Sequence, residues 1–248
     1  MRRAVPLLLL AALLGGWELA CRLVPLSELV LPRPAHVALV LFEEAASGRL
    51  LHHLLVTAGE MWLGLALGTG FALPVGAALA ESTALRRLAQ PYLIAMQVVP
   101  KLALAPLFLL WFGFGMRSIV VITALVCFFP ILENTVTGLA RVDPARLELF
   151  RMLRATRWQT LLRLRLPAGL PVILAGFRVA VVLALVGAVV GEFIMGRDGL
   201  GAAVMAAQGM MDTALMFALL LAIVALGSAA YGATLLAERL ILSERFLP

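Results

Sequence analysis

Charged residues and cysteines are scarce in this 248-residue sequence. Asp, Glu, Lys and Arg together make up 14% of the residues, and there are two cysteines. Soluble domains carry roughly 25% charged residues, so the polar side chains here are too few to cover a water-soluble globule. Cys21 and Cys127 lie in or beside apolar runs, where cysteine is typical of a small buried hydrophobe. We therefore expect neither a soluble fold nor a disulfide scaffold.

Motifs for several other functions are also missing. No glycine-rich phosphate-binding loop of the Walker type is present, so this chain is not expected to hydrolyse ATP or to hold a cofactor. No stretch alternates basic and aromatic residues, so the net charge of +6 does not indicate nucleic-acid binding. His36, His52 and His53 have no Cys or Asp cluster near them in the sequence, which favours a surface role over a metal site. No catalytic His–Glu or Ser/His/Asp set occurs within the apolar runs, which disfavours a membrane-embedded enzyme.

Long apolar runs are what the sequence has in their place. Hydrophobic residues make up 63% of the chain, in runs of the length that crosses a hydrocarbon core about 30 Å thick. The runs are continuous, whereas strands of a membrane barrel would alternate in polarity. The sequence predicts an all-α integral membrane protein with about six transmembrane helices, near residues 5–24, 58–80, 92–112, 118–138, 169–191 and 214–236.

The first run resembles a secretory or lipoprotein signal. Glu18 stands three residues before Cys21, where a lipoprotein site needs an aliphatic residue, and further spans follow. We therefore expect a retained first helix. The chain divides into residues 1–57, a transmembrane helix plus an external amphipathic segment of one or two helices, and residues 58–248, a five-helix core that includes a cytoplasmic loop at residues 139–168.

Basic residues alternate strongly between successive connections. Lys and Arg collect in cytoplasmic loops, so the side with more of them is predicted to be cytoplasmic, and both termini with it. Thirteen of the 20 Lys and Arg fall on that side: Arg2, Arg3, Arg86, Arg87, Arg141, Arg146, Arg151, Arg154, Arg157, Arg163, Arg165, Arg239 and Arg245.

The loop between the fourth and fifth spans is patterned as a helix–turn–helix. Asp143-Pro144 is a good helix start, because the Asp side chain can cap free N–H groups and Pro suits the first helical position. Thr156 to Gln159 matches a capping box at a second helix start. We expect this second helix to end at Pro167 and the next span to open at Pro171. Its apolar and Arg-rich faces indicate docking on a partner.

This loop resembles the EAA signature of ABC importer permeases, Glu-Ala-Ala, three residues, Gly, nine residues and Ile-x-Leu-Pro. Glu148 matches the Glu, Leu164 the Ile, and Leu166-Pro167 the closing pair. The two alanines are replaced, and Arg154 stands where the family has the glycine of the bend, so we expect Arg154 to find another backbone path or the bend to fall at Ala155. The resemblance implies ATPase coupling through Glu148, Leu149, Phe150, Arg151, Leu153, Arg154, Ala155, Thr156, Leu164, Leu166 and Pro167.

The resemblance extends over nearly the whole chain. Leu31-Pro32-x-Pro34, Pro100-x-Leu102-Ala103-Leu104-x-Pro106 and Leu110-Trp111-Phe112-Gly113 are similar to the MetI-like branch that imports nitrate, sulfonates, taurine and pyrimidine or riboflavin-type vitamins. It implies a permease subunit of the bacterial inner membrane that works by alternating access. The implied partners are a second permease subunit, forming a homodimer, two ATPase subunits that bind ATP and Mg, and an extracytoplasmic substrate-binding protein.

Ionisable and amide side chains within the apolar runs are candidates for the solute path. Charged groups at membrane depth are costly and tend to be functional, and the candidates are Lys101, Gln97, Glu133, Arg178 and Glu192. An ion-coupled secondary transporter or a channel would also have six spans. It would leave the patterned Arg-rich loop without a purpose, and it would be expected to carry more acidic groups at mid-membrane.

Overall fold

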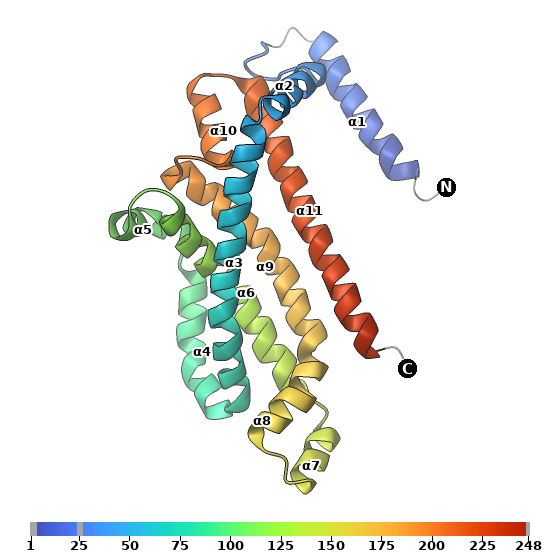
Figure 1. Cartoon of the computed structure of the whole chain (residues 1–248), viewed down its shortest axis with the longest axis vertical. Helices are drawn as coiled ribbons and strands as arrows, with labels where there is room; N and C mark the ends of the chain where they lie inside the picture. Colours follow the sequence, from blue (N-terminus) through green and yellow to red (C-terminus); the bar gives the residue numbers. More distant parts are fainter. Residues whose placement is uncertain (1–3, 24–26, 247–248) are drawn as a thin grey trace.

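The computed structural model describes residues 4–23 and 27–246, and every regular element among them is a helix (Figure 1). The elements are α1 (Ala4–Leu23), α2 (Pro34–Ala46), α3 (Arg49–Glu81), α4 (Thr83–Val98), a 3-10 turn (Lys101–Leu104), α5 (Ala105–Phe112), α6 (Met116–Ala140), α7 (Pro144–Met152), α8 (Arg157–Thr160), a π-helical turn (Leu161–Arg165), α9 (Leu166–Met195), α10 (Leu200–Gly209) and α11 (Thr213–Phe246).

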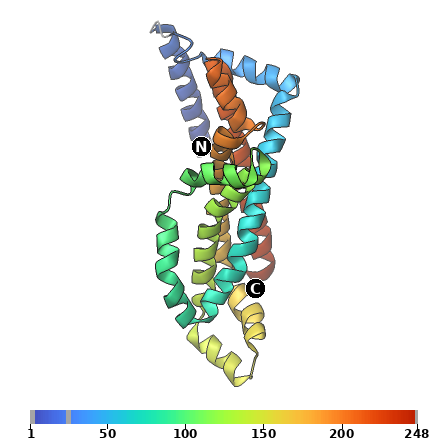
Figure 2. The same cartoon turned by 90° about the vertical axis from the view of Figure 1, so that its left-hand side faces the viewer.

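Helices α3, α6 and α9 run side by side and form the core of the molecule (Figures 1 and 2). Their shared interior is built from fully buried residues such as Met61, Ile122 and Val181. The backbones of α6 and α9 approach each other closely at Gly138 and Gly169. A Cβ added to Gly138 would lie 2.8 Å from the carbonyl oxygen of Gly169. Two residues without side chains therefore allow backbone to meet backbone at this crossing.

The all-α membrane fold is confirmed. Among the described residues, four helical stretches are long and apolar enough to cross a membrane: Arg49–Glu81, Met116–Ala140, Arg157–Met195 and Thr213–Leu242. Thr83–Val98 and Lys101–Phe112 are bent by 77° relative to each other, and they add a fifth span if the bent pair counts as one. Helix α1, 20 residues long, coincides with the first predicted span and contacts the bundle through a ring pair between Trp17 and Phe217.

The prediction of one continuous third span at residues 92–112 is wrong. Helix α4 ends at Val98, and Pro100 precedes a 3-10 turn that leads into α5. Proline lacks the N–H that would continue the helix and disfavours helical backbone at the residue before it, here Val99. The apolar run is therefore divided between two short helices that meet at a sharp angle, as the view in Figure 2 shows.

The segment after the first helix, predicted to be external, contains one separate amphipathic helix, α2. The residues that follow it, from Arg49 onwards, are already the first turns of α3, which continues without a break to Glu81. Residue 57, the expected division between the two parts of the chain, lies inside this helix.

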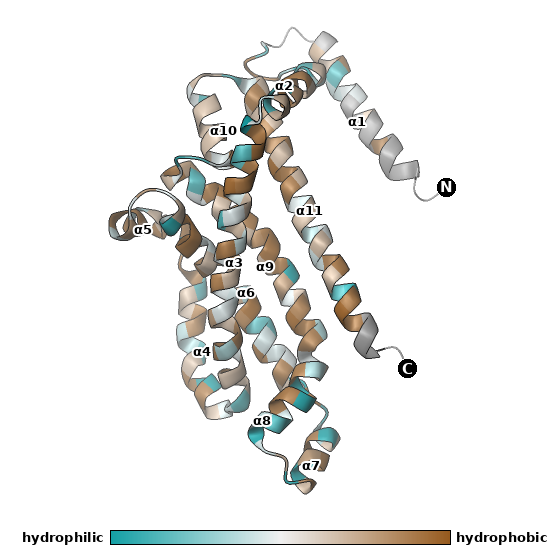
Figure 3. Ribbon diagram, in the orientation of Figure 1, coloured by the Kyte–Doolittle hydropathy of each residue, from teal (hydrophilic) through white to brown (hydrophobic). Residues whose placement is uncertain are grey.

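At the end of the molecule opposite α2, hydrophilic residues gather on α7 and α8, while hydrophobic residues dominate α5, α9 and α11 (Figure 3).

Candidate functional site

The loop predicted to dock on a partner projects beyond the ends of α3, α4 and α11 (Figures 1 and 2). Both predicted helix starts are confirmed. Asp143 accepts a hydrogen bond from the N–H of Ala145 at 2.9 Å, and Pro144 opens α7. Thr156 and Gln159 form a reciprocal capping box, with bonds of 3.2 Å to the Gln159 N–H and 2.8 Å to the Thr156 N–H. These caps give a short loop two well-defined helices.

The bend between α7 and α8 falls at Arg154, and the expectation of another backbone path there is wrong. Arg154 has a φ of +49°, in the left-handed region that glycine adopts without strain. Its N–H bonds to the carbonyl of Arg151, and the N–H of Ala155 bonds to the carbonyl of Phe150. These two bonds are those of a Schellman helix end, which favours the left-handed residue strongly enough for an arginine to occupy it.

The second helix of the loop does not end at Pro167, and Pro171 does not open a new one. Both prolines lie within a helix that continues from α8 through the π-helical turn into α9. The π-helical turn at Leu161–Arg165 directly precedes Pro167. Proline has no N–H to donate, and its ring clashes with the carbonyl four residues earlier in an ordinary α-helix. The wider π-helical turn before Pro167 gives room for the ring. The loop is thus joined to the membrane span by a continuous helix.

The outer side of this loop exposes large apolar side chains. Leu149 is 53% exposed, Leu153 69% and Trp158 71%. Glu148, Arg151, Arg154 and Thr156 are exposed among them, whereas Leu164 is buried at the root of the loop. Exposed apolar patches of this kind are typical of surfaces that bind a protein partner. Met152, 76% exposed, belongs to the same surface and was not among the predicted coupling residues, although it stands at one of the unspecified positions of the signature.

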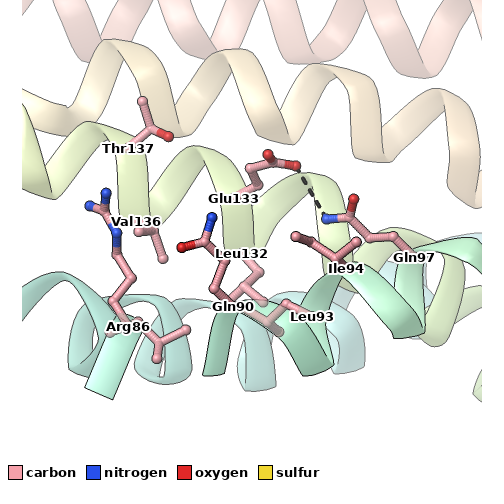
Figure 4. A pocket seen from close by; sticks show the side chains of 10 residues that line it. Arg86, Gln90, Leu93, Ile94, Gln97, Leu132, Glu133, Val136 and Thr137 are labelled. Carbon is pink, nitrogen blue, oxygen red and sulfur yellow. Dashed lines mark hydrogen bonds between the residues drawn. The ribbon is translucent and has the colours of Figure 1, made fainter. Parts of the chain in front are cut away.

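Three of the five candidates for the solute path come together between α4 and α6. The amide of Gln97 donates to the carboxylate of Glu133 at 3.4 Å (Figure 4). The ammonium of Lys101 donates to the backbone carbonyl of Gln97 at 3.3 Å. The ammonium of Lys101 also lies 4.8 Å from the ring centre of Phe129. Asn134 lines the same groove and was not among the candidates. Its position one residue after Glu133 is the signal that could have identified it.

The other two candidates lie elsewhere. Arg178 forms an ion pair of 3.1 Å with Glu238, which joins α9 to α11. Glu192 is 1% exposed, next to the equally buried Glu60, and accepts a hydrogen bond from the N–H of Gly201 at the start of α10. Arg178 therefore joins α9 to α11, and Glu192 joins α9 to α10.

The histidine pair on α3 has an acidic neighbour that sequence proximity did not reveal. Asp198, from the turn before α10, comes within 4.8 Å of donor atoms of His52 and His53. His53 accepts a hydrogen bond at Nδ1 from the N–H of Gly199. A neutral imidazole that accepts at Nδ1 carries its proton on Nε2, which leaves it no free lone pair for a metal. The three residues therefore tie the turn to α3.

A family model described as "Binding-protein-dependent transport system inner membrane component" matches residues 68–242. The chain belongs to this family. It is 38% identical over 232 residues to the riboflavin transport system permease protein of Chloroflexus aurantiacus, which covers 94% of this chain and 87% of that protein. It is 36% identical over 231 residues to a probable ABC transporter permease protein of Haemophilus influenzae, which covers 93% of this chain and 94% of the relative.

A solved structure of the same architecture supports the fold. The structure titled "Inward facing conformations of the MetNI methionine ABC transporter" aligns with a TM-score of 0.71 at 17% identity, covering 80% of this chain and 98% of that one. At this identity the likeness concerns the fold alone. Family and fold together make this protein the membrane-spanning permease subunit of a MetI-type ABC importer, a subunit that is not itself an enzyme. Membership implies an ATPase and a substrate-binding protein as partners.

Proposed function

We propose that two copies of this permease enclose a solute path and dock on two ATPase subunits through the α7–α8 loop, residues 143–160, here named the docking loop. Each copy would move between inward-open and outward-open arrangements as the ATPase pair closes and opens. In the orientation that we propose, the docking loop and both termini lie in the cytoplasm. The Arg-rich composition of the docking loop supports this placement, because basic residues favour the cytoplasmic face.

One observation carries the proposal, the exposed apolar surface on the docking loop. Leu149, Leu153 and Trp158 lie on two capped helices that extend from a long continuous helix. A loop with no partner would leave these side chains in water, at a cost of roughly 1.5–3 kcal/mol for each large apolar side chain that could be buried. A groove on a separate ATPase subunit would bury them. The adjoining Glu148 and Arg151 would then provide polar contacts at the rim.

The solute belongs to the class of small organic molecules or anions. Relatives with high coverage are named for the transport of riboflavin and of formylaminopyrimidine, the second from Halalkalibacterium halodurans at 36% identity over 79% of this chain. A putative aliphatic sulfonates permease of Bacillus subtilis is 34% identical over 96% of this chain. We propose a vitamin or pyrimidine precursor, a sulfonate, taurine or nitrate as the solute, delivered from outside by the binding protein.

Affinity purification from the native membrane tests the docking. A tagged chain should bring down a P-loop ATPase and a binding protein, both identified by mass spectrometry. The double variant Glu148→Arg/Leu153→Asp should lose the ATPase, because it reverses one charge and places another in the apolar contact. Leu29→Asp makes the same polar change at an exposed apolar site outside the docking loop and should retain the ATPase.

Two results would contradict the docking proposal. One is recovery of the tagged chain alone under gentle detergent. The other is recovery of equal amounts of ATPase with the double variant and with the unchanged chain. The solute is tested separately, by calorimetry of the recovered binding protein with riboflavin, formylaminopyrimidine, taurine and an alkanesulfonate.

A further inference from the structure

One face of α4 carries polar side chains at regular intervals. Arg86, Gln90 and Gln97 lie within an arc of about 40° when successive residues are placed 100° apart around a helix. This face is directed towards α6, where Glu133 and Thr137 are one turn apart (Figure 4). No residue of α4 is fully buried in the single chain. The polar stripe is thus accessible along its whole length.

Two hollows lie along this stripe. The inner one, about 340 Å³, is lined by Arg86, Gln90 and Thr137 and lies nearer the docking loop. The outer one, about 500 Å³, is lined by Lys101, Phe129 and Asn134 among others. We name them the inner chamber and the outer chamber.

Gln97 and Glu133 are the residues that line both chambers. Their hydrogen bond of 3.4 Å crosses from α4 to α6 at the point where the chambers meet (Figure 4). A bond of this length is weak, and its two side chains are exposed, so water or a solute group can replace it at little cost. The pair thus lies between the two chambers and is joined by an interaction that is easily opened.

The formal charges along the two chambers do not balance. Arg86 and Lys101 contribute two positive charges, and Glu133 contributes one negative charge. Charges within an apolar membrane are tolerated where they face a water-filled cavity. A cavity with a low-dielectric wall and an excess of one sign concentrates ions of the opposite sign. These chambers should therefore attract anions and repel cations.

We propose that the Gln97–Glu133 hydrogen bond is a gate between two chambers of the solute path, and that Arg86 and Lys101 make this path selective for a small organic anion, a carboxylate, sulfonate or phosphate, over a cation of the same size. This inference rests on the proposed function, because it assumes that the groove between α4 and α6 faces the path. The amide and carboxylate of the gate offer a donor and an acceptor to the passing solute. Lys101 and Arg86 lie on the two sides of the gate and bind the negative group of the solute one after the other.

Thiol labelling in native membrane vesicles tests the gate without knowledge of the solute. The background is Cys21→Ser/Cys127→Ala, because these are the two cysteines of the chain. Gln90→Cys then reports on the inner chamber, and Asn134→Cys reports on the outer chamber. The probes are two membrane-impermeant thiol reagents of similar size, the anionic sulfonatoethyl and the cationic trimethylammonioethyl methanethiosulfonate. Val224→Cys, at an exposed apolar position of α11, is the control for labelling outside the path.

The gate predicts a specific pattern of rates. In vesicles that expose the docking-loop side, the anionic reagent should modify Gln90→Cys at least tenfold faster than Asn134→Cys. Adding Glu133→Ala should remove most of that difference. Equal rates before Glu133→Ala is added, or an unchanged difference after it, would overturn the gate.

Charge selectivity is tested in the same vesicles. At Gln90→Cys the anionic reagent should react about threefold or more faster than the cationic one, and Arg86→Gln should abolish this preference. A faster cationic reagent, or no reaction of either reagent above the Val224→Cys level, would overturn the anion path. Co-purification of the ATPase does not depend on these rates, so failure of the gate is distinguishable from failure of the proposed function.

Discussion

The crossing of α6 and α9 at Gly138 and Gly169 makes a sharp prediction for a single added methyl group. In Gly138→Ala the new Cβ would lie 2.8 Å from the carbonyl oxygen of Gly169. That atom belongs to the backbone of a packed helix, so the contact cannot be relieved by a side-chain rotation. Gly70→Ala in α3 is the matched control, because nothing lies within 4 Å of the position its Cβ would take.

Both variants gain helix stability from alanine, and only Gly138→Ala also introduces a steric clash. Replacing glycine by alanine inside a helix stabilises it by about 1 kcal/mol. Overpacking typically costs about 1–3 kcal/mol, and a backbone contact places Gly138→Ala at the upper end. The net loss for Gly138→Ala is then about 2 kcal/mol, whereas Gly70→Ala gains about 1 kcal/mol. For a chain of this size, 1 kcal/mol shifts Tm by about 2–4 °C. Gly138→Ala should melt about 4–8 °C lower and Gly70→Ala about 2–4 °C higher.

The buried thiol of Cys127 provides the assay. It is 0% exposed, so a thiol-reactive fluorophore labels it as the helices separate on heating. Cys21, which is half-buried, is replaced by serine in all variants to leave a single reporter. The reasoning would be refuted if Gly138→Ala melted at or above the temperature of Gly70→Ala in the same detergent.

Three further predictions concern the docking loop and the outer helices. Arg154→Gly should raise Tm by about 2–4 °C, because a left-handed φ of +49° costs an L-residue about 1 kcal/mol that glycine avoids; a lower Tm would contradict it. Thr156→Ala should increase the rate of trypsin cleavage in the docking loop about fivefold, since loss of an N-cap costs about 1 kcal/mol, while Thr160→Ala, whose hydroxyl bonds to a carbonyl within its own helix, should leave the rate unchanged. Glu238→Gln should destabilise the chain by about 1 kcal/mol, because it leaves Arg178 unpaired between α9 and α11; adding Arg178→Gln should restore part of the loss, and a double-mutant cycle with no coupling energy would rule the pair out as a stabilising contact.

Helix positions were largely predictable because membrane spans and helix caps depend on local sequence. The apolar runs mark α3, α6, α9 and α11, and the caps at Asp143 and Thr156 mark both helices of the docking loop. Each depends on residues within one or two turns of each other. Resemblance to a family was needed to connect this loop with an ATPase.

The errors arose where proline or a bend has more than one outcome. Pro100 divides the third apolar run, whereas Pro167 and Pro171 stay within one helix. Pro74, Pro91 and Pro130 also lie inside helices, so a proline in an apolar run does not by itself tell a break from a continuous helix. Arg154 likewise takes the backbone conformation of the glycine that it replaces, because the hydrogen bonds at the end of α7 require it.

Pairings between distant residues could not be predicted at all. Gln97 and Glu133 are 36 positions apart, and His53 and Gly199 are 146 positions apart. Which polar residues within the apolar runs meet, and which hold separate helices together, depends on how the helices rotate against one another. The hydropathy pattern carries no information about that rotation. Arg178 and Lys101 therefore look alike in the sequence but have different neighbours in the structure.

The unbroken helix from Arg157 to Met195 has a mechanical consequence. At 1.5 Å per residue its 39 residues extend about 58 Å. The backbone contact at Gly169 and Gly138 lies 12 residues from the docking-loop end and 26 residues from the other. If that contact acts as a fulcrum, the two arms of the lever measure about 18 Å and 39 Å. A displacement of the docking loop would then be about doubled at the far end, where α9 meets the turn that leads into α10.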